Sequence, residues 1–143
     1  METEIKDFRG IKFGEPSKDV RPLRTDPDGI LWCDRQEEFK VGIIRVSTIE
    51  YGFYKGKFMM GRITFGGEEE YLVLLTALSQ KYGKFDNLWK IGNVRIKLNF
   101  TSNMNTGSLI YEYDPLVVEL RTDLEKKQTA ELKMKVNAAK GDL

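Results

Sequence analysis

The stretch STIEYGFYKGKFMMGRITF, residues 47–65, decides the predicted fold because it has the pattern of two strands joined by a turn. Strand side chains alternate between two faces, so the turn length fixes which residues share a face. A two-residue turn over 55–56 places the apolar residues of the two strands on opposite faces. A three-residue loop over 54–56 unites them and puts Gly56 at the left-handed position of a bulged turn, so the sequence favours it. The predicted inward set is Ile49, Tyr51, Phe53, Met59, Ile63 and Phe65.

The opposite face of this hairpin is too apolar to be solvated surface alone, so we expect another segment or a partner to cover part of it. Exposed aromatic side chains beside basic ones can stack nucleic-acid bases or meet an acidic protein. Lysines beside a turn glycine are ordinary exposed charges, however, and no nucleic-acid partner is expected. The candidate binding surface is Tyr54, Lys55, Lys57, Phe58, Met60 and Arg62.

Downstream of the hairpin, the pattern predicts a helix, a second hairpin and a C-terminal helix. Acids in the first turn and a glycine after the last turn predict a helix over 68–82 that packs on the sheet. Strict alternation predicts a strand over 94–100, paired with a strand over 108–113. Asp114 and Pro115 open a weakly amphipathic helix over 115–140, which we expect to project from the body or hold a partner.

Upstream of the hairpin, residues 8–23 predict an extended segment, a glycine turn and a short helix with Ser17 as its N-cap. Residues 24–29 predict a polar loop. Two strand candidates follow, Ile30–Cys33 and Phe39–Val46. The charged run 34–38 contains three acids, and we interpret it as a solvated turn rather than a metal site.

Composition bounds the possible functions. The chain has 143 residues, 41% of them hydrophobic, and a net charge of +1, which provides no global field for nucleic acid or an anionic bilayer. It has no histidine and one cysteine, Cys33, so histidine-based catalysis, intrachain disulfides and cysteine zinc sites are excluded. No apolar run approaches the length of about 20 residues that a membrane-spanning helix needs.

Together these elements predict one α+β domain over 1–143, with 115–140 as a helical extension. We expect an antiparallel, twisted sheet of about five or six strands, built from tandem α-β-β units and covered on one face by the helix 68–82.

Four segments resemble a family of small uncharacterised bacterial proteins, many of them exported. They are FRGIKFGEPSKDV, IEYGFYKGKF, LSQKYGKF with Trp89 following, and AAKGDL. More distantly, the glycine followed by a Ser/Thr helix start and the hairpin ending in an apolar strand resemble the α-β-β repeat of the small lipoproteins that assist outer-membrane barrel assembly, and the β-lactamase inhibitor protein fold built from such repeats. These resemblances imply a location in the bacterial envelope. Lipid anchoring is not implied, because Cys33 lies deep in the chain rather than at its N-terminus.

We therefore expect a non-catalytic binding or assembly module that uses a sheet face, without a cofactor or metal. One alternative is a small-ligand-binding protein or a carboxylate-based enzyme. No spacing selects a catalytic pair among Asp26, Asp28, Asp34, Glu37, Glu38, Glu68, Glu69 and Glu70. A second alternative is a homodimer through Leu124, Leu132 and Val136. We expect a periplasmic protein if a signal peptide precedes Met1 in the gene, and a cytoplasmic one if Met1 is the natural start.

Overall fold

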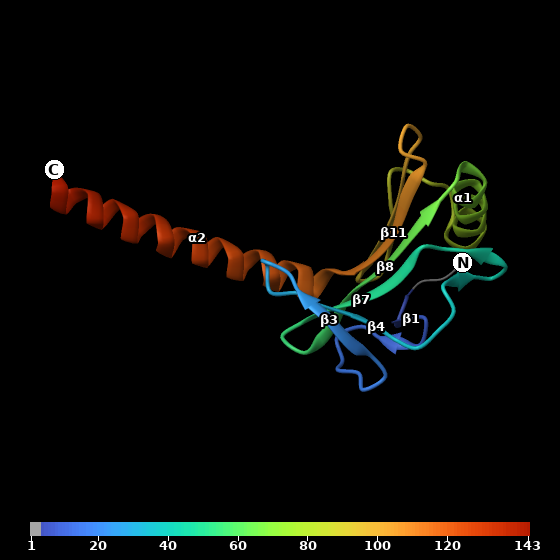
Figure 1. Cartoon of the computed structure of the whole chain (residues 1–143), viewed down its shortest axis with the longest axis horizontal. Coiled ribbons are helices and arrows are strands. Elements are labelled where there is room, and N and C mark those ends of the chain that lie inside the picture. The colour runs from blue at the N-terminus through green and yellow to red at the C-terminus, as the bar shows by residue number, and fades with distance from the viewer. Residues whose placement is uncertain (1–3) are drawn as a thin grey trace.

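A seven-stranded antiparallel sheet forms the centre of the computed structural model, which describes residues 4–143. Its strand order is β3-β4-β7-β8-β11-β10-β9. Helix α1 covers one face, and α2 leaves the domain on the other side (Figure 1). The strands are β1 (Asp7–Phe8), β2 (Ile11–Lys12), β3 (Arg21–Thr25), β4 (Leu31–Asp34), β5 (Lys40–Val41), β6 (Ile44–Arg45), β7 (Thr48–Tyr54), β8 (Lys57–Gly66), β9 (Trp89–Ile91), β10 (Val94–Thr101) and β11 (Thr106–Tyr113); the helices are α1 (Glu68–Tyr82) and α2 (Asp114–Asp142).

The central hairpin β7–β8 has the predicted strands but a different turn. Lys55 and Gly56 both have positive φ, 51° and 78°, and form a two-residue turn between the paired residues Tyr54 and Lys57. This is the turn type whose twist matches that of the flanking strands. The predicted three-residue loop is therefore wrong, although the left-handed conformation of Gly56 is confirmed.

A bulge inside the hairpin corrects the predicted faces. Phe53 pairs with Phe58, whereas Gly52 pairs with Met60, so Met59 is the extra residue. Beyond the bulge, Ile49 pairs with Ile63 and the predicted inward face is preserved. Near the turn the faces of two residues exchange: Phe58 joins the core beneath α1, and Met59 joins the cluster beneath α2.

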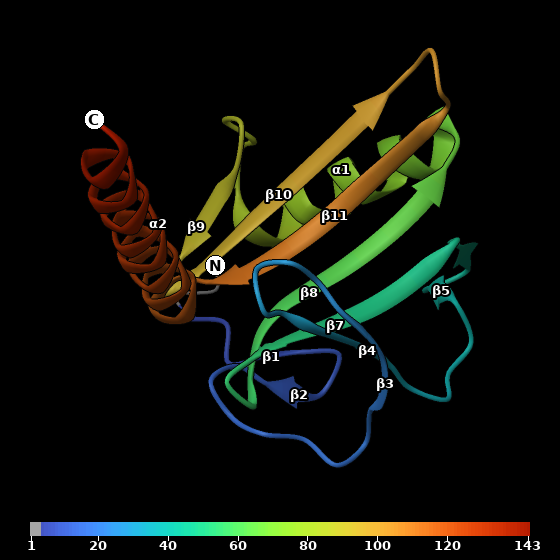
Figure 2. The ribbon, with the colours of Figure 1, turned by 60° about the vertical axis from the view of Figure 1, so that its left-hand side comes forward.

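Helix α1 and the second hairpin confirm their predictions. The helix spans Glu68–Tyr82, starts after Gly67 and buries Leu74, Leu78 and Tyr82 against the sheet. Strands β10 and β11 pair along their full length beside β8, and Figure 2 shows all three running across α1. Alternate residues of β10, from Val94 to Leu98, are buried as the pattern predicts.

The segments before the central hairpin depart most from prediction. No helix forms near Ser17 in the described chain. The Ser17 hydroxyl accepts a hydrogen bond from the Asp19 amide at 3.2 Å, but the chain then extends into β3. The predicted strand over 39–46 is instead two short strands, β5 and β6, that pair with each other around Gly42. Strand β4 confirms the other strand candidate.

The main sheet has seven strands rather than the expected five or six. With the first helix absent from the described part, tandem α-β-β units are not confirmed. An N-terminal hairpin, β1–β2, closes one end of the core where Phe8 packs over Gly61.

Helix α2 spans 29 residues, longer than the predicted 115–140. Only its first part packs on the domain, and the remainder projects outward (Figure 1). Within the described chain, neither helix is long and apolar enough to cross a membrane.

Candidate protein-interaction surface

The six residues predicted as a binding surface do not form one exposed patch. Phe58 is fully buried on the α1 side of the sheet, because the bulge turns it away from the other five. Tyr54 is buried on the α2 side, and Met60 is half-buried beside it. The apolar part of the candidate binding surface is therefore packed inside the molecule rather than exposed.

The base of α2 is what covers this patch. Leu116 and Leu120 on consecutive turns are buried in one cluster with Tyr54, Met59 and Trp32. This apolar contact fixes the helix to the tip of the central hairpin and to β4. Covering by another segment of the chain was one of the two possibilities that the sequence left open for this face.

Polar contacts also hold the base of α2 against the tip of the central hairpin; we call this contact region the joint. The Tyr54 hydroxyl donates to Asp123 Oδ2 at 2.5 Å, and Lys55 Nζ lies 2.9 Å from the same oxygen. Lys55 also lies 3.8 Å from Glu119. The hydrogen bond to Asp123 raises the pKa of the Tyr54 phenol, and the bonds from Tyr54 and Lys55 lower the pKa of Asp123. The lysine expected to be a free charge thus serves to dock α2.

Beside the joint, the sheet face carries ion pairs that cross neighbouring strands. Glu50 on β7 accepts hydrogen bonds from Arg24 at 2.8 Å and from Arg62 at 2.7 Å. Arg62 also lies over the Trp32 ring, 4.1 Å from its centroid. The Arg24 and Arg62 bonds lower the pKa of Glu50, although burial opposes them. Arg62 is therefore held within the face, and Lys57 is the member of the predicted set that stays exposed without taking part in the joint.

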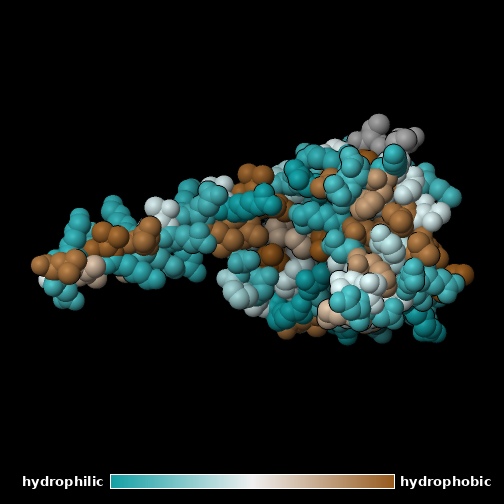
Figure 3. All heavy atoms as spheres, turned by 90° about the horizontal axis from the view of Figure 1, so that it is seen from above, coloured by the Kyte–Doolittle hydropathy of each residue, from teal (hydrophilic) through white to brown (hydrophobic). Residues whose placement is uncertain are grey.

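The outer part of α2 extends from the domain as an exposed helical arm. Every residue from 125 to 143 is exposed, including Leu132 (63%), Met134 (72%) and Val136 (45%). Figure 3 shows this arm extending away from the domain, with hydrophobic residues at its outer end. At about 1.5 Å per residue, the exposed helix is about 27 Å long.

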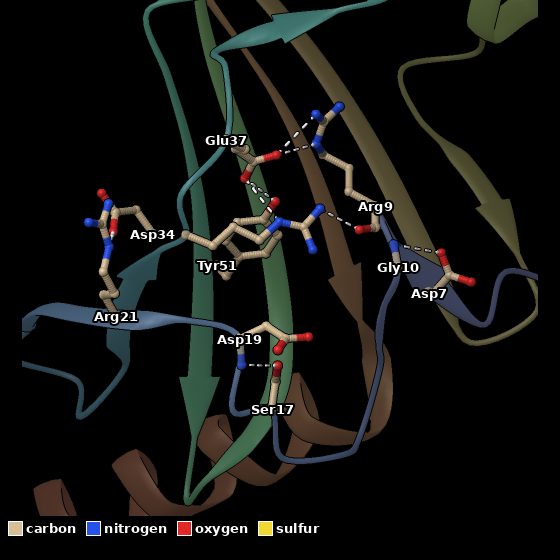
Figure 4. A network of polar contacts seen from close by, with 10 residues as sticks. Asp7, Arg9, Gly10, Ser17, Asp19, Arg21, Asp34, Glu37 and Tyr51 are labelled. Carbon is tan, nitrogen blue, oxygen red and sulfur yellow. Dashed lines mark hydrogen bonds and ion pairs between the residues drawn. The ribbon is translucent and has the colours of Figure 1, made fainter.

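A partly buried polar cluster lies where the sequence suggested a solvated turn (Figure 4). The Glu37 carboxylate accepts hydrogen bonds from Arg9 Nη2 at 3.0 Å, from Arg35 Nε at 3.2 Å and from the Tyr51 hydroxyl at 2.5 Å. Its side chain is only 11% exposed. Burial, and then the bond to Glu37, raises the pKa of the Tyr51 phenol. The sequence missed this cluster because Arg9 lies 28 residues from Glu37 and no local pattern links them.

The geometry of this cluster fits a structural role rather than a catalytic one. The carboxylate faces three donors, and Arg35 also donates to the Arg9 carbonyl oxygen at 2.6 Å. These bonds hold the N-terminal hairpin and the loop before β5 against β7. A general acid or base needs a titratable group that is open to a substrate, and here each oxygen is already bonded.

Of the cavities around the N-terminal hairpin, two are candidates for a small-ligand site. One of about 540 Å³ is lined by Lys6, Lys12, Glu15 and Tyr113 among others. The second, about 270 Å³, lies between the hairpin and α1 and has apolar walls that include Phe8, Leu78 and Leu109. The acids lining the first, Glu4 and Glu15, are both exposed, so the cavity lacks the contrasting environments that separate the pKa values of a catalytic pair.

Among residues 4–143, no group of acids and Cys33 is arranged to hold a metal ion.

Comparison of the chain with protein-family models, with curated proteins and with solved structures gives no match. The family resemblances read from the sequence motifs therefore stay predictions.

Proposed function

We propose that this protein is a non-catalytic binding or assembly module whose protein partner packs on the outer half of α2 together with the residue that follows it, residues 125–143. The observation that carries the proposal is that every residue in this half of a firmly anchored helix is exposed, including the large apolar residues Leu132 and Val136. The sheet-face surface expected from the sequence is replaced in this proposal, because the base of α2 occupies it.

The anchoring supports a role in presentation. Tyr54 and Lys55 clamp α2 at Asp123, immediately before the helix leaves the domain. An anchored base removes the cost of nucleating the helix, so the outer half starts from an existing helical turn. Its residues are mostly strong helix formers, and Glu131 and Lys135 stand at the favourable i, i+4 spacing. The partner would thus meet a preformed helix and lose little binding free energy to ordering it.

The alternative of a small-ligand-binding protein or carboxylate enzyme has weaker support. It requires a deep pocket with converging acids, and the acids beside the larger cavity are exposed and accompanied by lysines. The homodimer alternative uses the same helix, with a second copy of the chain in place of a different partner.

Site-specific photo-crosslinking in the producing cells tests the proposal. A photoreactive amino acid is placed at Leu132 or Val136, at Met134 on the other side of the same helix, and at Arg62 on the sheet face. We expect a discrete crosslinked species from positions 132 and 136 and none from 134 or 62. Crosslinking from position 62 alone, or from no position, contradicts the proposal.

A further inference from the structure

Four apolar residues towards the end of the chain, together with Thr129, follow coiled-coil spacing, whereas Met134 lies on the opposite side of α2. Thr129, Leu132, Val136, Ala139 and Leu143 are separated by three, four, three and four residues. We call these five residues the outer seam. Such spacing places them along one narrow stripe of a helix, the pattern that pairs with another helix, whereas a helix lying on a sheet or a bilayer needs a wider apolar face.

The outer seam also lies on a different side of α2 from the residues that dock the helix. At 100° per residue, Leu132 and Val136 lie roughly 120° or more around the axis from Leu116 and Leu120. The burial pattern agrees, because Val118, in line with the seam, is 59% exposed even at the base of the helix. A partner helix can therefore follow the seam without displacing the domain.

Lysines border this seam. Lys126, Lys133 and Lys140 each follow a seam position of the heptad, and so form one continuous row at intervals of seven residues. On the other border stand Gln128, Lys135 and Asp142. These are the positions whose charges decide partner choice and orientation in helix pairs.

The lysine row disfavours a second copy of the chain as the partner. In an antiparallel pair, each border of the seam faces the same border of the second copy. The row of Lys126, Lys133 and Lys140 would then face the same row of lysines on the other helix. In a parallel pair, opposite borders meet, which sets Lys135 against Lys140 and Gln128 against Lys133. Neither orientation brings a carboxylate to the row, and like charges facing each other destabilise a pair.

An anionic membrane is also a poor match. The seam has only three large apolar side chains, Leu132, Val136 and Leu143. Residues 125–143 also carry three acids, Glu125, Glu131 and Asp142, beside five lysines. Membrane-surface helices instead combine a broad apolar face with a strongly basic one. The charge pattern is complementary to a helix that carries carboxylates beside its own apolar seam.

We propose that the occupant of the outer seam is a partner helix whose flanking positions are acidic. This inference rests on the proposed function, and it deepens that function by naming the chemistry of the partner.

Two synthetic peptides test it, each with leucine at the seam positions of four heptads. One carries glutamate at all flanking positions and the other lysine, and binding of the labelled peptide to the full chain is followed by fluorescence anisotropy. We expect the glutamate peptide to bind and the lysine peptide not to bind. Because the attraction is between exposed charges, affinity should fall about tenfold or more between about 0.05 M and about 0.5 M salt.

Variants separate the seam from its flank. Leu132→Asp should abolish binding, whereas the matched Met134→Asp variant should keep it, and circular dichroism should show the same helix content in both. The Lys133→Glu/Lys140→Glu variant should exchange the preference, so that it binds the lysine peptide.

Each other outcome overturns a distinct part of the account. Equal binding of both peptides removes the acidic partner and leaves a helix-binding module. A concentration-dependent dimer in sedimentation, lost in Leu132→Asp, assigns the seam to a second copy. Seam-dependent binding to vesicles of phosphatidylcholine and phosphatidylglycerol assigns it to a membrane. A monomer that binds neither peptide nor vesicles overturns the inference, whereas the absence of a crosslinked species from positions 132 and 136 in the producing cells overturns the proposed function.

Discussion

Gly61 lets the N-terminal hairpin close over the sheet. A Cβ atom at this position would lie 2.3 Å from Phe8 Cδ2, far inside van der Waals contact. We predict that Gly61→Ala destabilises the fold by about 1–3 kcal/mol, the usual cost of overpacking a core. Chemical denaturation measures this, with Gly66→Ala on the same strand as the control, since its nearest atom lies at 3.4 Å. Equal unfolding midpoints for the two variants would show that Phe8 moves aside freely.

The Glu37 carboxylate accepts hydrogen bonds from three residues, so removing its charge should lower the stability of the fold. We predict that Glu37→Gln lowers the free energy of unfolding by about 1–3 kcal/mol, because two guanidinium groups lose their carboxylate. The neighbouring Glu38 is exposed and pairs only with Lys40 at 2.8 Å, so Glu38→Gln should have little effect. Denaturant titration compares the two, and a similar loss in both would place the cost in the loop rather than in the cluster.

Glu50 gives the fold a dependence on acid pH. Its pKa is lowered by folding from the ordinary 4.5, so the unfolded chain binds the proton more readily. Its contribution is complete above pH 4.5 and is lost as the pH falls through the lower pKa of the folded state. We predict that unfolding free energy declines on acidification below that pH, and that the decline is shallower in Glu50→Gln. Identical profiles for the two proteins would rule out this contribution.

At the scale of elements, the sequence predicted those whose signals are local. Acids at its start and Gly83 at its end set the bounds of α1, and strict alternation identified β10. The short helix at Ser17 failed for a physical reason: the hydrogen bond to the Asp19 amide forms, but pairing of Arg21 with Asp34 continues the chain as a strand. The prediction of a three-residue loop at Gly56 failed because the bulge at Met59 has the same effect on side-chain alternation as the extra loop residue would have.

Helix α2 divides into a base that stabilises the domain and an outer half that does not. We predict that Leu120→Ala costs about 2–4 kcal/mol of unfolding free energy, because Leu120 is buried between the hairpin and β4. The matched change Leu132→Ala should cost less than about 0.5 kcal/mol, as for other surface positions. A comparable loss at Leu132 in denaturant titrations would mean that the outer half contributes to folding.

At the scale of the molecule, the sequence predicted a projecting helix but not the role of its base. Weak amphipathicity and the proline after Asp114 were visible in the pattern. The covering of Tyr54 and Met60 was not visible, because it depends on contacts between residues far apart in the sequence, such as Tyr54 and Asp123, which are 69 positions apart. The candidate surface consequently moves from the sheet to the helix that hides it.

The central claim is that partners engage the outer seam of α2 and leave the sheet face untouched. Nuclear magnetic resonance titration of the isotope-labelled chain with the glutamate peptide tests this most directly, since each backbone amide reports its own surroundings. The account predicts shift changes along residues 129–143 and unchanged signals from β7 and β8. Changes centred on Lys57, Arg62 and the neighbouring sheet face, with the outer half unaffected, would contradict it.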